Sequence, residues 1–313
     1  VGQGQQSATM RRLATTLVGR AQARSISGLS CNFEPARALS KEQIKGYHAD
    51  GYLLPEGSPT MRALGPEQAR RLRQNVEALE AREMRPARVL LRHGHTRYPW
   101  LHRLVTSGRI LDAIEDIIGP DILVWSVSAF IKEPGSESYI GWHQDANYWG
   151  LRPLDSIVTA WVALSDVGEH SGPMEFLRGS HLEDTYDPNS LLSRGQEIAW
   201  PEPVDRQNVV RAVMQAGEFS LHHVKLAHAS QPNRGVGRRI GLAIRYMPPC
   251  TFSERGMETA MLVRGEDHFG HFQLEKPPAA EDHPMAILQW QRGFAMKEQN
   301  VISGANKVSA RLA

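Results

Sequence analysis

Residues 217–247, GEFSLHHVKLAHASQPNRGVGRRIGLAIRYM, decide the fold because they hold two β-rich runs on either side of a turn. The runs at 217–224 and 238–247 carry the apolar, β-branched and aromatic residues that are typical of strands. The segment 231–237 between them contains proline, asparagine and glycine, which favour chain reversal. The pattern therefore predicts that the strand at 238–247 pairs antiparallel with the strand that carries His228.

Similar β-rich runs precede this stretch, and Gly, Pro, Asn and Asp residues separate them. These runs lie at 122–131, 157–164, 174–177 and 208–213. Several short strands with turn residues between them, and no alternation with helices, are typical of an all-β barrel or sandwich. The sequence therefore predicts a mainly β core.

Helices are predicted before and after this β-rich region. Ser40 and Gln43 have the spacing of a capping box, and Pro66 suits the first turn of a longer helix. Isoleucines at helical spacing indicate a third helix. The predicted helices lie at 40–47, 66–84, 110–118 and 283–295. The residues between Met247 and the last of these helices are predicted to form a loop.

Composition excludes several classes of protein. The chain has 313 residues, of which 36 are basic and 34 acidic, and the net charge of +2 gives no basic stripe for nucleic acid. No apolar run approaches the roughly 18 residues of a membrane helix. Cys31 and Cys250 form no C-x-x-C pattern, which favours a reducing compartment. We therefore expect a small-molecule substrate, and neither nucleic acid nor a membrane as a partner.

The two ends of the chain are predicted to lie outside the catalytic domain. Residues 1–33 contain no Asp or Glu but several arginines, which indicates either a mitochondrial transit peptide or a leader upstream of the real start. We therefore expect an N-terminal extension at 1–37, one domain at 38–296 and a tail at 297–313. The expected compartment is the cytoplasm or the mitochondrial matrix.

The segment Trp142-His143-Gln144-Asp145 indicates a metal site. On a β-strand, residues two apart share one face, so His143 and Asp145 could both bind one ion while Gln144 turns away. A second imidazole, from His228, would complete a set of two imidazoles and one carboxylate. That set leaves open coordination positions and suits non-haem Fe(II) and its oxygen chemistry.

Two other histidines compete with His228 as the distal ligand. His222 and His223 lie on or near the same predicted strand, and alternation places His222 on the same face as His228. Geometry alone leaves the choice open. The Pro-Asn pair that follows His228, and the interval of eleven residues to Arg239, favour His228.

Arg239 is the candidate for binding a co-substrate. A guanidinium inside a barrel needs an anionic partner, and arginine binds carboxylates in bidentate fashion. A dicarboxylate is therefore the expected co-substrate. Arg238 should point in the opposite direction and be exposed, because successive strand residues alternate.

These residues, in this order, resemble the phytanoyl-CoA dioxygenase family of iron- and 2-oxoglutarate-dependent oxygenases. The matching motif is His143-x-Asp145, His228-x-Ser230-x-Pro232-Asn233 and Arg239. The resemblance extends to neighbouring segments and covers about residues 38–275. These segments are Asp50-Gly51-Tyr52-Leu53, Thr159-Ala160-Trp161-Val162-Ala163-Leu164-Ser165-Asp166 and Gly179-Ser180-His181.

The resemblance implies a fold and a set of roles. The fold is mainly β, with a double-stranded β-helix core (jelly roll, cupin-like) and flanking α-helices. His143, Asp145 and His228 would bind Fe(II). Arg239 and Ser230 would bind the distal carboxylate of 2-oxoglutarate, and Trp161 would form a wall of its pocket.

The implied reaction uses O2 and 2-oxoglutarate to hydroxylate an unactivated C–H bond, with release of succinate and CO2. The carboxylate at position 145 favours hydroxylation, because related halogenases carry a small residue there. Family substrates include acyl-CoA thioesters, amino-acid derivatives and natural-product intermediates, and the sequence does not choose among these small or medium organic molecules. The alternative is a cupin-type metal-binding protein that is non-catalytic or needs no co-substrate.

Other aromatic and histidine residues allow two interpretations each. His93 and His95 are expected in a solvated loop, with the mouth of the substrate site as the alternative. His181 is expected to be a structural turn residue that bonds to the backbone. Tyr148 and Trp149 could belong to the core or form the floor of the substrate pocket.

Overall fold

The computed structural model describes residues 38–183 and 205–309, and of Tyr148 and residues 300–309 it describes the backbone alone. The expected N-terminal extension at 1–37 lies outside these residues. The described residues belong to one structural unit. None of their helices is long and apolar enough to cross a membrane.

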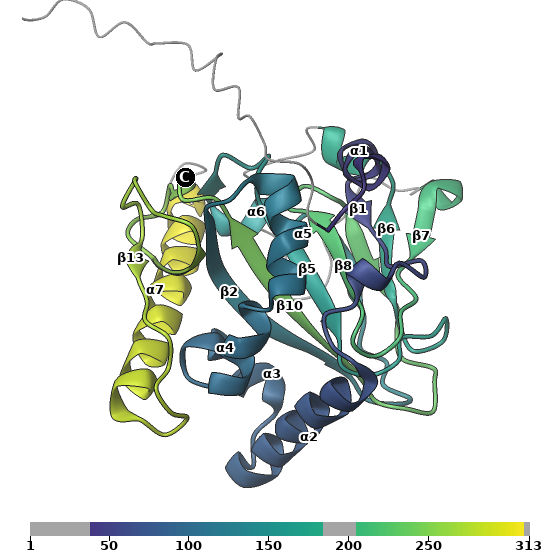
Figure 1. Cartoon of the computed structure of the whole chain (residues 1–313), viewed down its shortest axis with the longest axis horizontal. Helices are drawn as coiled ribbons and strands as arrows, with labels where there is room; N and C mark the ends of the chain where they lie inside the picture. The colour runs from purple at the N-terminus through teal and green to yellow at the C-terminus, as the bar shows by residue number, and fades with distance from the viewer. Residues whose placement is uncertain (1–37, 184–204, 310–313) are drawn as a thin grey trace, which may run out of the picture. The chain divides into compact units, whose positions relative to one another are not determined.

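The helical elements lie mostly before residue 120 and after residue 283 (Figure 1). The helices are α1 Lys41–Asp50, α2 Pro66–Glu83, α3 Ala87–Leu90, α4 Pro99–Val105, α5 Gly108–Ile118, α6 Ala146–Trp149 and α7 Pro284–Ser309. The 3-10 turns are η1 Pro59–Met61, η2 Gly94–Thr96, η3 Ser180–Leu182 and η4 Arg206–Asn208.

The strands form two main sheets and one small ribbon. The larger sheet has the order β1-β8-β5-β10-β2-β12-β13, the smaller one β3-β9-β6-β7, and β11 pairs with β4. The strands are β1 Tyr52–Leu53, β2 Ile122–Lys132, β3 Ile140–His143, β4 Leu151–Arg152, β5 Val158–Ala163, β6 Met174–Leu177, β7 Val209–Arg211, β8 Phe219–His223, β9 His228–Ser230, β10 Arg239–Met247, β11 Phe252–Ser253, β12 Thr259–Arg264 and β13 Gln273–Leu274.

Helices α2 to α5 lie against one face of the larger sheet, and α7 runs beside its β12–β13 edge (Figure 1). The helix α5 buries Ile110, Ile114 and Ile117 in the same core as the outward-facing residues of β2, β5 and β10. Burying this apolar face is what fixes the helix on the sheet. The opposite face of the larger sheet faces the smaller sheet, and the site lies between the two sheets.

Local sequence signals explain where the elements begin and end. Ser40 and Gln43 form the predicted capping box of α1. Gly51 ends this helix in the left-handed conformation, with φ of 84°, where a side chain would collide with His181. Glycine is therefore required at this turn for both reasons.

The predicted architecture is confirmed: two sheets form a mainly β, double-stranded β-helix core with flanking helices. The predicted helices at 40–47, 66–84 and 110–118 correspond to α1, α2 and α5. The six predicted β-rich runs correspond to β2, β5, β6, β7, β8 and β10. The last helix was placed correctly near residue 283, but it is longer than predicted.

Two predictions about strands were wrong. The strand β10 does not pair with the strand that carries His228: β10 lies between β2 and β5, whereas β9 lies between β3 and β6. The segment after β9 passes from the smaller sheet to the larger one, so it is a connection between sheets and not a hairpin turn. The predicted loop after Met247 contains β12, which extends the larger sheet by pairing with β2.

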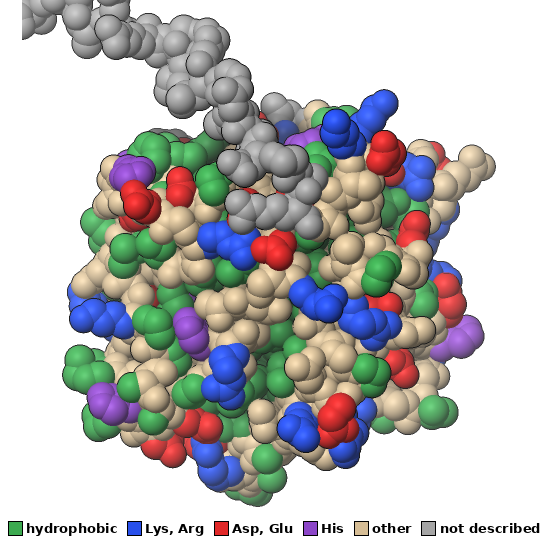
Figure 2. Space-filling view, viewed as in Figure 1, with side chains coloured by type: hydrophobic (Ala, Val, Ile, Leu, Met, Phe, Trp, Pro, Cys, Tyr) green, Lys and Arg blue, Asp and Glu red, His purple; other side chains and the backbone are tan. Residues whose placement is uncertain are grey.

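Charges are mixed on the surface of this unit. On the face shown in Figure 2, acidic and basic side chains are interspersed among apolar ones, with no gathering of a single sign. Ion pairs also join separate elements of this unit, such as Arg82 with Glu281 and Arg264 with Asp112. Interspersed charges of this kind create no extended field on the viewed face.

Candidate functional site

An open cavity of about 510 Å³ lies between the two sheets, and its lining contains every site residue that the sequence predicted. We call it the intersheet pocket. Its lining residues are Phe130, Ile140, His143, Asp145, Thr159, Trp161, Met174, His222, His228, Ala229, Ser230, Arg239, Ala243 and Arg245. Residues from 130 to 245 therefore converge on one cavity through the pairing of the sheets.

His143 and His228 face each other across the smaller sheet. They are register partners on β3 and β9, and their ring centroids are 4.1 Å apart. In each ring Nδ1 lies 2.9 Å from a backbone carbonyl oxygen two residues earlier, that of Gly141 or Leu226. A carbonyl oxygen only accepts hydrogen bonds, so Nδ1–H donates and Nε2 carries the lone pair that a metal needs.

Asp145 reaches the same point by a route that the sequence did not predict. The strand β3 ends at His143, and Asp145 is the N-cap of α6 with helical φ and ψ of −58° and −32°. The carboxylate of Asp145 is therefore brought toward His143 by a turn of the chain and not by the alternation of side chains along a strand. Gln144 does turn away from the pocket, where its amide donates to the carbonyl of Lys225 at 2.6 Å.

The three side chains form a compact set of donors. The candidate ligand atoms of His143, Asp145 and His228 all lie within 4.8 Å of one another. Nε2 of His143 is 3.8 Å from Oδ1 of Asp145. Burial lowers the pKa of His228 to about 4, so this imidazole is neutral at neutral pH. Two imidazoles and a carboxylate on one side of a cavity are chemically suited to Fe(II) with open positions.

Arg239 lies deep in the intersheet pocket without an acidic partner. Only 1% of the residue is exposed, and no carboxylate among the described residues pairs with its guanidinium. Burial lowers its pKa to about 10, so the group remains charged at neutral pH. The hydroxyls of Ser230 and Thr159, which also line the pocket, have no hydrogen-bond partner among the described residues. A buried cation in the same pocket as the unpaired hydroxyl of Ser230 fits a carboxylate ligand, whereas Thr159 lies opposite Arg245 on the neighbouring strand.

The Trp161 ring contacts Arg239, and the absence of a side chain at Gly241 makes room for this ring. The Arg239 guanidinium carbon is 5.3 Å from the centroid of the Trp161 ring. A Cβ atom at Gly241 would lie only 1.8 Å from Cζ2 of this ring. The indole therefore crosses β10 where the strand has no side chain, and it forms a wall of the pocket beside Arg239.

Sequence reasoning missed Arg245 as a pocket residue. Arg245 lies on the same face of β10 as Arg239, since six positions separate them on one strand. It is buried, and its guanidinium lies between the rings of Phe130 and Trp149 at 5.8 and 5.4 Å. Strand alternation counted from Arg239 could have identified it.

The structure distinguishes the two histidines that compete with His228 as the distal ligand. His222 lines the intersheet pocket with its ring 5.0 Å from that of His228, as alternation predicted. It does not belong to the group of convergent ligand atoms, which contains His228. His223 turns to the other side of β8 and contacts His181.

Other expectations have mixed outcomes. His181 is confirmed as a structural residue, because its Nε2 bonds to the carbonyl of His48 at 3.1 Å. The expectation for His93 and His95 was wrong: both are buried and neither lines the pocket. Trp149 packs against Trp125 in a core cluster and also contacts Arg245. The side chain of Tyr148 lies outside the described part of the structure.

Comparisons with known proteins identify a family model and several proteins that are similar to this chain. The family model described as phytanoyl-CoA dioxygenase (PhyH) matches residues 47–241. The ectoine dioxygenase of Bordetella parapertussis is 30% identical over an alignment of 237 residues, which covers 67% of this chain and 76% of that protein. A probable alpha-ketoglutarate-dependent hypophosphite dioxygenase of Stutzerimonas stutzeri is 30% identical over 49% of this chain.

The aligned share of these relatives varies. The chain spans 54% of the length of the hypophosphite dioxygenase and 45% of the peroxisomal phytanoyl-CoA dioxygenase of Bos taurus, about half of each protein. Among solved structures, the non-heme monooxygenase ThoJ has a TM-score of 0.74 and 30% identity, with 85% of this chain and 99% of that chain covered. The carbocyclase SnoK, at 22% identity and a TM-score of 0.57, shares the fold. The chain therefore belongs to the phytanoyl-CoA dioxygenase family.

Proposed function

We propose that the protein is an Fe(II)- and 2-oxoglutarate-dependent oxygenase that hydroxylates an unactivated C–H bond of a small or medium organic substrate. In the balanced reaction, substrate R–H, 2-oxoglutarate and O2 give R–OH, succinate and CO2. Relatives whose names include ectoine dioxygenase and alpha-ketoglutarate-dependent hypophosphite dioxygenase support this reaction class. Their substrates differ in chemistry, so the substrate of this chain is left as a class.

The observation that carries the proposal is the unpaired Arg239 in the same pocket as His143, Asp145 and His228. A metal-binding protein without a co-substrate has no need for a buried guanidinium that lacks a carboxylate. Burying a charge without a partner is unfavourable, and a dicarboxylate ligand removes that penalty. The same feature disfavours a non-catalytic or co-substrate-independent cupin.

The residues of the chain have distinct roles in this proposal. His143, Asp145 and His228 would hold Fe(II), with the Nδ1 hydrogen bonds fixing both imidazoles in the ligating orientation. Arg239 and Ser230 would bind the distal carboxylate of 2-oxoglutarate against the wall formed by Trp161. Fe(II), when bound, supplies the oxygen chemistry, and the protein positions the substrate and excludes water.

Succinate release tests the proposal. Purified protein with added Fe(II), 2-oxoglutarate and O2 should release succinate, at a basal rate even before the prime substrate is known. Asp145→Ala should abolish that release, because the only carboxylate of the donor set is removed. Asp282→Ala, at an exposed carboxylate far along the chain, is the matched control and should retain the wild-type rate.

The outcomes separate the alternatives. Succinate release that is unchanged in Asp145→Ala would refute the ligand assignment. An absence of succinate with any substrate of a broad panel, while Fe(II) still binds, would favour a non-catalytic metal-binding protein.

A further inference from the structure

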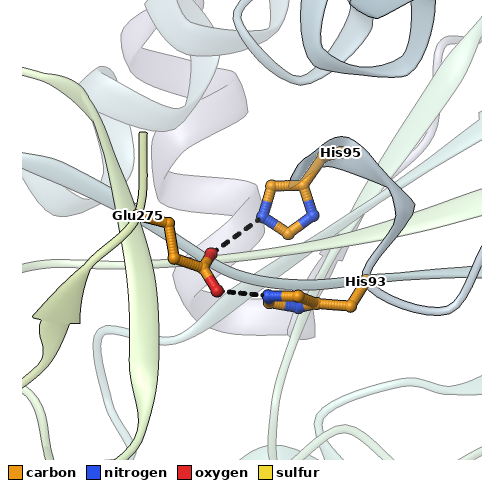
Figure 3. A group of neighbouring side chains, drawn as sticks. All are labelled: His93, His95 and Glu275. Carbon is orange, nitrogen blue, oxygen red and sulfur yellow. Dashed lines mark hydrogen bonds and ion pairs between the residues drawn. The ribbon is translucent and has the colours of Figure 1, made fainter. Parts of the chain in front are cut away.

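A second group of metal-ligating side chains lies outside the intersheet pocket, and the proposed function does not use it. The group consists of His93, His95 and Glu275, and we call it the second cluster (Figure 3). His93 is the N-cap of η2, His95 lies within η2, and Glu275 follows β13. Segments that are about 180 residues apart in the sequence therefore meet here (275 − 95 = 180).

The carboxylate of Glu275 faces both imidazoles. Its Oε1 lies 2.5 Å from Nε2 of His93, and its Oε2 lies 3.6 Å from Nε2 of His95. Figure 3 shows both rings directed at the carboxylate from the same side. One ligand atom from each residue falls within 4.8 Å of the other two. A set of this size needs only small side-chain movements to surround an ion with bonds of about 2.0–2.2 Å.

His95 is the member of the cluster that protein contacts leave unsatisfied. The residue is 0% exposed, and neither ring nitrogen has a hydrogen-bond partner among the described residues. A separation of 3.6 Å from Glu275 is too long for a hydrogen bond. A proton shared between Nε2 of His93 and Oε1 of Glu275 would satisfy those two atoms but would leave Nε2 of His95 and Oε2 of Glu275 without a partner. One cation bound to all three residues would satisfy these facing atoms together.

The backbone around the cluster is shaped for close approach. His93 has a positive φ of 57°, which is uncommon for a non-glycine residue and places its ring next to that of His95. The helix α7 passes over the cluster at Gly293, where a Cβ atom would lie 2.6 Å from both Oε1 of Glu275 and Nε2 of His93. Glycine therefore lets the helix backbone cover the cluster directly.

The charges nearby are compatible with a cation. Glu275 and Glu258 are both buried carboxylates on this side of the larger sheet. Lys297 of α7 donates to the carbonyl and hydroxyl of Thr259 at 2.8 and 3.1 Å, and its charge also acts on both carboxylates, so two acidic groups here face this ammonium.

We propose that His93, His95 and Glu275 form a second, structural metal site that binds Zn²⁺ and fastens the β13–α7 segment to η2. Two imidazoles and one carboxylate are a donor set that zinc favours. Glu275 also lines a surface cavity between α7 and the β12–β13 edge, so the cluster lies next to a solvent-filled space. This site is independent of the proposed oxygenase activity.

Zinc stoichiometry tests the proposal when the first site is disabled. Chelator-treated protein is incubated with Zn²⁺, desalted and analysed for bound metal. Wild-type protein should retain two equivalents, since zinc also binds the His143, Asp145 and His228 set. The variant His143→Ala/His228→Ala should retain one equivalent, and adding His95→Ala to it should remove that equivalent.

A matched control and a second readout keep the test decisive. His102→Ala, in the same double-variant background, removes a nearby half-buried imidazole outside the cluster and should leave the equivalent in place. Zn²⁺ should also raise the Tm of the double variant, because it binds the assembled site of the folded state more tightly than the unfolded chain. Co²⁺ should give the visible absorption of a low-coordinate site with nitrogen and oxygen ligands.

The proposal is overturned if the double variant retains no zinc, or if His95→Ala leaves its zinc equivalent intact. Should His95→Ala fail to fold, the comparison of wild type with the double variant decides: one equivalent retained by the double variant supports the site, and none refutes it. Loss of this zinc without loss of succinate release would separate the second cluster from the oxygenase function.

Discussion

Arg239 and its neighbour Arg238 offer a matched pair of guanidinium groups. Arg239 points into the intersheet pocket, where it has no acidic partner among the described residues. Arg238 points the other way, where it pairs with Glu80 and Glu133. The predicted opposite orientation is confirmed, although Arg238 is only partly exposed.

Arg239→Gln should raise the KM for 2-oxoglutarate by about 10- to 150-fold, because a charge-assisted hydrogen bond worth about 1.5–3 kcal/mol is lost. Steady-state succinate release at varied 2-oxoglutarate concentration gives the value. Arg238→Gln is the control and should leave this KM unchanged. Oxygen consumption that is indifferent to Arg239→Gln would instead indicate an oxygenase that needs no co-substrate.

Glycines within elements show how closely their neighbours approach. Gly293 of α7 and Gly46 of α1 are both helical, but only Gly293 has atoms of another element within 3 Å of a Cβ position. The intrinsic preference of a helix for alanine over glycine, roughly 0.5–1 kcal/mol, applies to both. Their difference therefore isolates the effect of packing.

Gly293→Ala should destabilise the protein by about 1–3 kcal/mol, because overpacking against Glu275 and His93 outweighs the gain in helix propensity. Gly46→Ala should stabilise it by about 0.5–1 kcal/mol, since nothing lies within 4 Å of its Cβ position. Urea denaturation in the presence of chelator measures both. Equal effects at the two positions would contradict the packing at α7.

Gly241 of β10 sets the position of the pocket wall. Gly241→Ala should displace the Trp161 ring from Arg239 and lower stability by about 1–3 kcal/mol, because the new Cβ would overlap the indole. The second change Trp161→Leu should recover part of this loss, and a double-mutant cycle in urea measures the coupling. Gly237→Ala, with nothing within 4 Å, is the control. Additive effects of the two changes would refute the overlap.

Elements with a strong local signal could be predicted from the sequence, and those defined by long-range pairing could not. The helix α1 could be predicted from its capping box. The strand β10 could be predicted from its run of apolar, β-branched and aromatic residues, all nine residues of which are buried. The strand β9 has three residues and exists because β3 and β6 flank it. For the same reason the partner of β10 was predicted wrongly: turn residues show where the chain reverses, but not which sheet it enters.

Part of the site was also predictable. The residue types and their order identified His143, Asp145, His228 and Arg239 as neighbours in one pocket. How Asp145 arrives there could not be predicted, because β3 ends at His143, two residues before the position that strand alternation required. The His93-x-His95 pair is visible in the sequence, but its burial and its contact with Glu275 could not be predicted, because they depend on a segment that follows by some 180 residues.

At the scale of the whole molecule, buried neutral histidines make stability depend on pH. His223 accepts a hydrogen bond at Nδ1 from the backbone N–H of Lys225. The side chains of His181, Tyr47, Asp155 and Lys225 also face or influence it. Burial lowers its pKa from an ordinary value near 6.5 to about 4.

The sign of the effect follows from proton uptake. Between pH 6.5 and about 4 the unfolded chain binds a proton at position 223 that the folded chain does not bind. The free energy of unfolding should therefore fall as the pH is lowered through this window, by roughly 1.4 kcal/mol per unit from His223. Urea denaturation at pH 7 and pH 5.5 measures the change.

His223→Gln should reduce this pH dependence by the share of one histidine, even if it lowers the stability at pH 7. His268→Gln, at an exposed imidazole, serves as the matched control. A variant with the same slope as wild type between pH 7 and pH 5.5 would show that His223 does not cause it.

If His143 and His228 bind Fe(II) as proposed, their placement opposite each other would couple strand alignment to iron loading. If β3 shifted by one residue along β9, one of the two imidazoles would turn to the far side of the smaller sheet. A misaligned chain could then not capture the ion, and a captured ion would hold the correct alignment in place. Only molecules with the correct strand alignment would bind iron, so iron would selectively stabilise the correctly folded protein.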